Sequence, residues 1–330
     1  MEILRERRVL KKVLITGCNG FVGWHLCRRM LDEGILVRGV SRTIEKSNGP
    51  FEQVCVGDIG PYTDWNDAMS GVDTIVHLAA LTHVMDDIAS DLESAFVKVN
   101  SYGTETLAKA AINRGVSRLV FISSVKVNGD GTSKKNSIAY TEIDSPLPND
   151  AYALSKWKAE CVLNKIASET GFEIVILRPP LVYGPKVKAN FLRLLKVVER
   201  GIPLPLASVK NQRSLIYLDN LVDAIVTCIK HPKASGQTYF VSDGDDVSTP
   251  DLIRRIGSAL GRPARLFPFP PLMLKMVGIT TGKSATIDTL LRSLTINCSK
   301  IRRELDWKAP FSMDQGLRET AKWYMEKAAQ

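Results

Sequence analysis

The feature that most constrains the fold is a short apolar run followed by a glycine-rich turn and a helical pattern. Residues 13–16 have the β-branched character of a buried strand, and residues 21–33 have the spacing of an amphipathic helix that ends at Gly34. The turn contains Gly17, Gly20 and Gly23, which let a backbone approach a pyrophosphate at a helix N-terminus. This order predicts the first βα unit of a dinucleotide-binding domain.

The alternation continues through the first half of the chain. We expect further strands and helices at the following places: strands at 36–40, 74–78, 118–123 and 173–178, and helices at 92–114 and 150–170. Continuous apolar strands between amphipathic helices predict an α/β fold, a Rossmann-type doubly wound parallel sheet with ligands at the carboxyl ends of its strands. Prolines then become frequent, so we expect a dinucleotide-binding domain at 1–178. A smaller α/β substrate lobe is expected at 179–330, with segments around 215–242 returning to the sheet.

Composition excludes several classes of protein. The chain is 45% hydrophobic and 24% charged, as globular domains are, and its net charge of +9 is scattered rather than gathered into a nucleic-acid-binding patch. The N-terminus does not resemble a signal peptide, and the longest apolar segment, residues 266–279, is too short to span a bilayer. We therefore expect a cytoplasmic protein without membrane insertion, although contact of that segment with a membrane surface stays open. The six cysteines and four histidines lack zinc spacing, which predicts buried free thiols and no metal site.

The end of the second expected strand bears on the choice of cofactor. Ser41 and Arg42 stand where a carboxylate would read the ribose of NAD, and Arg42 could instead hold the extra phosphate of NADP. Stacking of Arg42 on adenine is the alternative, and it would permit either cofactor. Asp58, with Ile59 beside it, could accept a hydrogen bond from the adenine amino group. We expect NAD or NADP, with a modest preference for NADP(H).

A second motif carries proton chemistry. Tyr152 and Lys156 lie four residues apart on one helical face, and a nearby ammonium together with an oxidised nicotinamide would lower the pKa of the phenol. Ser124 follows the strand at 118–123 and could stabilise negative charge on the same substrate oxygen. These three residues are the expected catalytic group.

The whole set of motifs resembles the extended short-chain dehydrogenase/reductases of the NAD-dependent epimerase/dehydratase family. Nearly the whole chain takes part, in the family order. The matching segments are the TGxxGxxG turn at 16–23, His77-Leu78-Ala79-Ala80, Asn100 before Gly103-Thr104, Tyr152–Lys156, the RxxxVYGP border at 178–185, Arg213–Asp219 and the closing segment at 297–307. UDP-galactose 4-epimerases and related UDP-sugar 4-ketoreductases are the most similar group.

The resemblance implies roles for particular positions. Tyr152 would be the acid/base, Lys156 its electrostatic partner and a ribose ligand, and Ser124 the helper hydroxyl. The implied cofactor-binding residues are Gly17, Asn19, Gly20, Phe21, Val22, Gly23, Ser41, Arg42, Asp58, Ile59, Leu78, Ala79, Ala80, Asn100, Tyr152 and Lys156. The implied substrate-binding residues are His83, Ser124, Lys126, Asn190 and Arg213. A surface salt bridge is the alternative role for Arg213.

Two departures from the family pattern narrow the expected reaction. Leu181 replaces the asparagine of the border motif, so one substrate contact is lost or comes from elsewhere. Val125 and Lys126 stand where 4,6-dehydratases carry Asp and Glu, so dehydration lacks its acid and base. We expect 4-epimerisation or 4-keto reduction of a nucleotide sugar, with a UDP-linked sugar preferred, for surface polysaccharide. The segment at 123–129 resembles a bacterial branch near enzymes that make UDP-N-acetyl-6-deoxyhexosamines, and this resemblance slightly favours the reductase.

Two further expectations concern other functions and assembly. A non-catalytic, redox-sensing module that kept the nucleotide fold would have a damaged Tyr/Lys/Ser set, whereas here that set is intact. By resemblance, the helices at 92–114 and 150–170 would form a four-helix bundle in a homodimer.

Overall fold

A seven-stranded parallel sheet forms the centre of the larger lobe. The computed structural model describes residues 10–43, 49–82, 89–131, 139–282 and 284–328. The strand order is β3-β2-β1-β4-β5-β6-β9, and every neighbouring pair is parallel. The strands are β1 (Lys12–Thr16), β2 (Leu36–Ser41), β3 (Glu52–Cys55), β4 (Thr74–His77), β5 (Arg118–Ile122), β6 (Glu173–Arg178) and β9 (Gln237–Phe240). The expected Rossmann-type sheet is confirmed.

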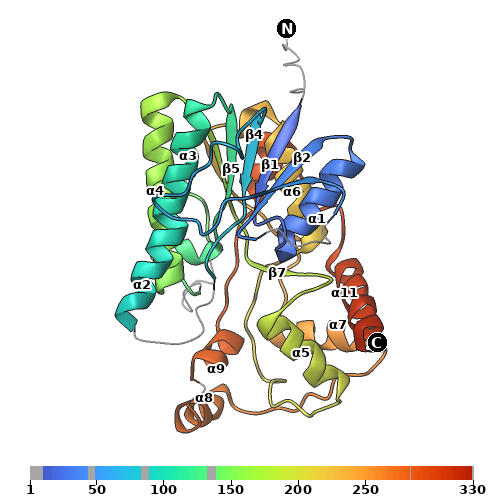
Figure 1. Cartoon of the computed structure of the whole chain (residues 1–330). Coiled ribbons are helices and arrows are strands. Elements are labelled where there is room, and N and C mark those ends of the chain that lie inside the picture. The colour runs from blue at the N-terminus through green and yellow to red at the C-terminus, as the bar shows by residue number, and fades with distance from the viewer. Residues whose placement is uncertain (1–9, 44–48, 83–88, 132–138, 283, 329–330) are drawn as a thin grey trace.

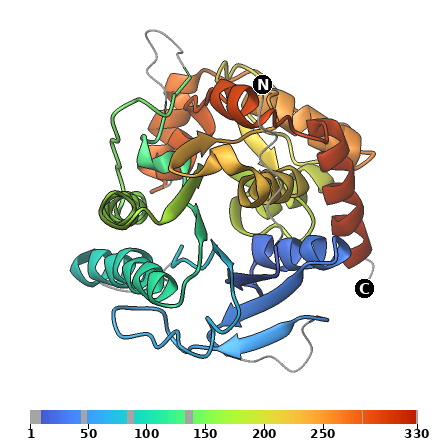
Figure 2. The same cartoon turned by 90° about the horizontal axis from the view of Figure 1, so that it is seen from above.

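Helices cover both faces of this sheet, as Figure 2 shows from above. One face carries α1 (Phe21–Asp32) and α6 (Leu218–Lys230), and the other carries α2 (Ala89–Val97), α3 (Gly103–Asn113) and α4 (Ala151–Thr170). Alternation along β1 explains both layers: Val13 and Ile15 pack in the core beneath α1 and α6, whereas Leu14 belongs to the core beneath α3 and α4.

The smaller lobe lies below the carboxyl ends of the strands (Figure 1). Its short sheet pairs β7 (Leu181–Tyr183) with β8 (Leu215–Tyr217) in parallel. Its helices are α5 (Ala189–Glu199), α7 (Thr249–Ala259), α8 (Pro271–Thr280), α9 (Ser284–Leu291) and α11 (Met313–Ala328), while α10 (Ser299–Leu305) packs against β9. Aromatic and aliphatic side chains such as Tyr183, Phe191 and Ile253 form a separate core there.

The chain crosses between the lobes more than once. After β6 it enters the small lobe, returns through β9 to the edge of the main sheet beside β6, and enters the small lobe again. Of the residues near 215–242 that were expected to return to the main sheet, β9 pairs there, whereas β8 pairs in the short sheet.

The expected single helix at 92–114 is interrupted by a π-helical turn, η1 (Lys98–Tyr102), between α2 and α3. Single π turns inside α-helices are frequent at functional sites. Short 3₁₀ turns lie at η2 (Val125–Val127) and η3 (Pro232–Ala234).

The structure also bears on the cysteines, metals and the membrane. None of the six cysteines, all of which lie in the described residues, forms a disulfide, but Cys55 and Cys161 are exposed, so the expectation that every thiol is buried is wrong. Within the described residues, no helix is long and apolar enough to span a bilayer, and no group of three or more potential metal ligands gathers.

Candidate active site

The glycine turn that follows β1 is shaped for close approach of a ligand backbone or phosphate. Gly17 has φ +69°, and a Cβ there would lie 3.0 Å from the backbone nitrogen of Ala79. A Cβ at Gly23 would lie 2.1 Å from the carbonyl oxygen of Gly17, so no larger residue fits. Gly20 is the N-cap of α1 and brings no side-chain cap, which leaves the first-turn N–H groups for an anion. The turn fits a dinucleotide pyrophosphate.

A chain of hydrogen bonds joins the ends of β1 and β4 to α3. Thr104 Oγ1 donates to the carbonyl of Asn100 at 2.7 Å and lies 2.9 Å from His77 Nε2, so Nε2 carries the proton and donates. His77 Nδ1 then accepts from Thr16 Oγ1 at 2.7 Å, and that hydroxyl accepts from the amides of Leu78 and Ala79, both at 3.1 Å. Burial, followed by the nearby Lys156 charge, lowers the pKa of His77 to about 3, so the ring is neutral.

Asn100 lies in the π turn and is used inside the protein. Its Nδ2 donates to the carbonyl of Leu81 at 3.0 Å and to Ser155 Oγ at 2.9 Å, and its Oδ1 accepts from the amide of Leu81 at 2.8 Å. Both amide hydrogens are therefore taken. Asn100 ties the segment after β4 to α4, and its expected role as a cofactor ligand stays a prediction.

Tyr152 and Lys156 stand in the first two turns of α4, where β5 ends. The Lys156 side chain is buried, its Nζ donates to the carbonyl of Ile122 at 2.8 Å, and it lies 4.4 Å from the ring centroid of Phe121. Tyr152 packs edge-on against Phe96 of α2, with ring centroids 6.2 Å apart. α4 therefore presents a phenol and an amine at the carboxyl edge of the sheet.

The pKa values of this pair bear on the expectation that the Lys156 ammonium and an oxidised nicotinamide together lower the pKa of the phenol. Burial, and then the Asp150 carboxylate, raise the pKa of Tyr152 to about 12. Burial lowers the pKa of Lys156 to about 7, against a raising effect of Glu160. Both shifts have the same cause, because a water-poor site disfavours either charge. An activated phenolate here needs further positive charge.

Ser124 and Lys126 form a short polar segment directly after β5. Ser124 caps η2 by accepting from the amide of Lys126 at 3.2 Å. The Lys126 Nζ lies 2.6 Å from Asp150 Oδ2, while Asp150 Oδ1 caps α4 by accepting from the amide of Ala153 at 2.6 Å. Lys126, expected to bind substrate, is thus joined to the N-terminus of the helix that carries Tyr152.

A buried ionic network beneath the site was missed in the sequence. Glu160 accepts hydrogen bonds from Ser123 Oγ and from Arg178, whose Nε lies 3.0 Å from Oε1. Arg178 also donates to Asn128 Oδ1 at 3.0 Å, and all four side chains are buried. The signal was available: Glu160 follows Lys156 by four residues, so both lie on the buried face of α4. The network joins α4, β5 and β6 around the expected catalytic group.

The residues expected near the adenosine lie along the ends of β2 and β3. Ser41 Oγ donates to the carbonyl of Thr43 at 2.7 Å, and Arg42 is exposed. Asp58 is exposed and Ile59 is half-buried, with its Cγ2 2.5 Å from where a Cβ on Gly103 would lie. The remaining expected cofactor residues flank the glycine turn: Asn19 is exposed, and Phe21, Val22, Leu78, Ala79 and Ala80 are half-buried.

The substrate residues expected in the small lobe are less tightly held. Arg213 donates to the backbone carbonyls of Thr289 and Arg292, and burial lowers the pKa of its guanidinium. No carboxylate of the described residues lies within ion-pair distance of it. Asn190 is exposed in the first turn of α5, and Leu181 is 44% exposed. His83 lies outside the described residues.

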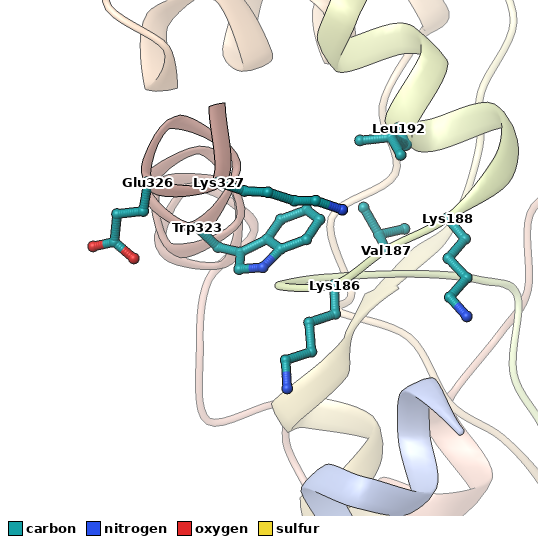
Figure 3. Close-up of a pocket in the computed structure, with 7 residues that line it drawn as sticks. All are labelled: Lys186, Val187, Lys188, Leu192, Trp323, Glu326 and Lys327. Carbon is teal, nitrogen blue, oxygen red and sulfur yellow. The ribbon is translucent and has the colours of Figure 1, made fainter. Parts of the chain in front are cut away.

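One cavity lies away from these residues. It has a volume of about 440 Å³ and is lined by Lys186, Val187, Lys188, Leu192, Trp323, Glu326 and Lys327 (Figure 3). The Nζ of Lys186 lies 3.9 Å from the ring centroid of Trp24, and that of Lys327 lies 5.7 Å from that of Trp323. None of the expected site residues lines it, so this cavity is separate from the candidate site.

Comparisons with known proteins agree with this arrangement. The profile of the NAD dependent epimerase/dehydratase family matches residues 13–242. The UDP-glucose 4-epimerase of Vibrio cholerae is 41% identical and is covered over 98% of its length by 97% of this chain. N-acetyl-alpha-D-glucosaminyl-diphospho-ditrans,octacis-undecaprenol 4-epimerase of Escherichia coli O157:H7 is 28% identical over 94% of each chain.

Solved structures share the fold. UDP-glucuronic acid 4-epimerase from Bacillus cereus, in complex with UDP-glucuronic acid and NAD, has a TM-score of 0.78 and 23% identity, and the alignment covers 96% of this chain and 99% of that one. The family profile spans the strand–turn–helix that begins at β1 and reaches just past β9. The chain belongs to the NAD-dependent epimerase/dehydratase family.

Proposed function

We propose that this protein is an NAD-dependent 4-epimerase that acts on a UDP-linked hexose or N-acetylhexosamine. It would work in the cytoplasm and supply precursors for surface polysaccharide. The observation that carries the proposal is the placement of Tyr152 one helical turn before the buried Lys156, where β5 ends at the same edge of the sheet as β1 and its glycine turn, with β4 between them. The 41% identity to a UDP-glucose 4-epimerase over nearly the full length supports it.

The chain's own residues would move one proton in each direction. Tyr152 Oη, as phenolate, takes the proton of the C4 hydroxyl while hydride leaves C4, which gives a 4-keto sugar and a neutral phenol. After the keto sugar rotates, the same phenol returns the proton to the C4 oxygen as hydride arrives on the other face. Ser124 Oγ donates a hydrogen bond to that oxygen as negative charge develops.

Because the pKa of Tyr152 is near 12, the site must supply positive charge to form the phenolate. When bound, the oxidised dinucleotide supplies the hydride acceptor and a positively charged ring. Protonated Lys156 adds a second positive charge, and its Nζ is already held by the carbonyl of Ile122. The other two N–H bonds of that ammonium are available to the ribose hydroxyls and the phenol oxygen. The two positive charges together favour the phenolate.

Arg213 is assigned to the substrate diphosphate together with Asn190. A half-buried guanidinium without a carboxylate partner among the described residues is suited to phosphate, which it meets with two fixed donors. At the reaction end, Val125 and Lys126 lie in η2, where a 4,6-dehydratase needs carboxylates, so elimination of water has no acid or base there.

The test is turnover without added cofactor. Purified protein would be incubated with UDP-glucose, UDP-galactose and their N-acetylhexosamine counterparts, and the C4 epimers would be resolved by anion-exchange chromatography. Tyr152→Phe should lower kcat at least a thousandfold, whereas Tyr102→Phe, at an exposed tyrosine, should leave it unchanged. Retained turnover in Tyr152→Phe would remove the mechanism, and stoichiometric loss of NAD(P)H on a 4-keto sugar would identify a ketoreductase instead.

Arg42 is the residue through which we expect the chain to distinguish NADP from NAD. Because β2 ends without a carboxylate, an NADP 2′-phosphate would meet no repulsion there, and the exposed Arg42 could bind it. If so, Arg42→Ala should weaken NADP binding at least tenfold and NAD binding less than threefold, measured by calorimetry. Equal effects would assign Arg42 to adenine stacking.

The assembly is proposed as a homodimer. On the outer face of the larger lobe, α2 and α3 follow one another through η1, and α4 lies beside them (Figure 1); Tyr102 of η1 is 50% exposed. Two copies of this face would form a four-helix bundle. Light scattering after gel filtration should give twice the chain mass, and a monomer at micromolar concentration would contradict the proposal.

A further inference from the structure

Helix α8 exposes an unusual amount of apolar surface. Leu272, Met276 and Ile279 are between 61% and 72% exposed, and Met273 and Val277 are about half exposed. The stripe that packs on protein is narrow: Leu274 is buried, and a Cβ at Gly278 would lie 3.0 Å from Ile287 Cδ1 of α9. A helix that is apolar around most of its circumference is normally covered.

This surface lies at an extremity of the molecule. In Figure 1, α8 and α9 form the end of the small lobe farthest from the main sheet. The neighbouring segments are tied together by backbone hydrogen bonds, from the amide of Leu204 to the carbonyl of Arg265 at 2.8 Å and from the amide of Phe267 back to that of Leu204 at 3.0 Å. Ile202 and Phe267 add further exposed apolar area there. We call α8, α9 and residues 200–210 and 262–270 the tip.

The tip and its immediate surroundings are strongly basic. Residues 200–218 contain three basic residues and no acid, and residues 262–292 contain five basic residues against the single acid Asp288. Asp288 is itself 3.8 Å from Lys275 and 3.5 Å from Arg292. Arg262 and Arg265 are exposed, and in the part of the chain that the structure describes no carboxylate lies within ion-pair distance of either.

Exposed apolar side chains next to segments with an excess of basic residues match one kind of partner. An anionic phospholipid bilayer accepts apolar groups at its headgroup boundary and attracts nearby arginine and lysine. A second copy of the chain fits less well, because a two-fold contact would place each basic surface against itself. The positive charge therefore favours an anionic bilayer over a second copy of the chain, whereas the exposed apolar area by itself would suit either.

We propose that the exposed face of α8 (Leu272, Met273, Met276, Val277 and Ile279) docks the protein peripherally on an anionic phospholipid membrane, with Arg262 and Arg265 contacting lipid headgroups. This goes beyond the proposed catalytic function and does not depend on it. It also has a geometric consequence: Arg213 donates to the carbonyl of Thr289 in α9, so the docked surface lies one helix away from the residue assigned to the diphosphate.

The experiment is flotation of the full-length, dinucleotide-loaded protein with vesicles. Vesicles of phosphatidylcholine with one quarter phosphatidylglycerol should carry the protein at low salt, and pure phosphatidylcholine should carry much less. The variant Leu272→Ser/Met276→Ser/Ile279→Ser should bind at least tenfold more weakly, because three apolar anchors are lost. Leu36→Ser is the matched control, since Leu36 is 61% exposed at the amino end of β2.

A second variant tests the charge. Arg262→Gln/Arg265→Gln should weaken binding to the anionic vesicles at least fivefold, while binding to neutral vesicles stays the same. Thermal unfolding and turnover of a water-soluble UDP-sugar by the triple-serine variant should match the wild type, which separates loss of docking from loss of folding or catalysis.

Three outcomes would overturn the proposal. The first is failure of the wild type to float with anionic vesicles. The second is equal flotation of the wild type and the triple-serine variant. The third is conversion of a wild-type dimer to a monomer by the three substitutions in sedimentation velocity, without flotation of either, which would assign the face to a second copy of the chain.

Discussion

The two groups of candidate site residues, one at the sheet edge and one in the small lobe, are built differently. On the sheet side, buried polar groups form two closed networks, Thr16–His77–Thr104 and Ser123–Glu160–Arg178. On the small-lobe side, Arg213 is held by backbone carbonyls, and Leu181 is 44% exposed. The contrast indicates which part of the site the fold holds rigidly. Several buried hydrogen bonds fix the side chains assigned to C4 chemistry, whereas the residues assigned to the sugar nucleotide can be replaced with little loss of folding stability.

The largest expected effect is a loss of folding stability when the buried network at the sheet edge is broken. Glu160→Gln keeps the shape of the side chain but leaves buried Arg178 without its counter-charge, so the free energy of unfolding should fall by about 3 kcal/mol in urea denaturation. Glu169→Gln on the same helix removes an exposed pair with Lys165 and should cost less than about 0.5 kcal/mol. Equal losses would mean that the buried network does not hold the sheet side together.

The second effect concerns acid stability. The pKa of His77, about 3 when folded, is below the ordinary value of 6.5, so between those pH values the unfolded chain binds more protons. Stability from this residue is complete above pH 6.5 and falls as the pH drops toward 3. From pH 7 to pH 4.5 we expect a loss of about 2 to 3 kcal/mol. His77→Gln, compared by denaturation at both pH values, should show a correspondingly smaller loss; an identical loss would contradict the assignment.

The third effect tests the small-lobe side. Arg213→Gln should raise KM for the nucleotide sugar by about ten- to a hundredfold, since a hydrogen bond to a charged group contributes roughly 1.5–3 kcal/mol, and should change kcat little. Arg292→Gln, at a 51% exposed arginine beside Asp288, is the control and should leave KM unchanged. A fall in kcat with constant KM would move Arg213 from binding to chemistry.

The smallest effect would sharpen the comparison. Leu181→Asn restores the amide that the family pattern carries at this half-open position, and one added neutral hydrogen bond is worth about 0.5–1.5 kcal/mol. We expect KM to fall about threefold without change in thermal stability, because the side chain is partly exposed. A large loss of stability would show that the small-lobe side is as constrained as the sheet side.

Much of the fold follows from local pattern. The strands at 12–16, 36–41, 118–122 and 173–178 lie within a residue or two of their expected positions, because continuous apolar runs bounded by turns leave few alternatives. The π turn at 98–102 was not predictable from periodicity, since it is held by tertiary hydrogen bonds of Asn100 with Leu81 and Ser155.

The site was partly predictable for the same reason. Motif spacing identified Tyr152, Lys156 and the glycine turn, whose placement depends on neighbours in the chain. Glu160 was missed because its partners, Ser123 directly after β5 and Arg178 at the end of β6, come from separate segments of the chain. Spacing does not reveal burial, which raises the pKa of Tyr152 to about 12 in the chain by itself, so the expected lowering by the ammonium and an oxidised nicotinamide together stays a prediction.

The pairing of β9 with β6 has a consequence for biosynthesis. A nascent chain that ends at Arg178 has an uncovered sheet edge at Val175–Arg178 and lacks α6, which packs beside α1. The nucleotide-binding half therefore cannot mature on the ribosome as soon as its own motifs have emerged. Its sheet is completed only after roughly sixty further residues, through Phe240, have been synthesised. Early stalling or truncation should therefore yield aggregation-prone fragments rather than a folded domain.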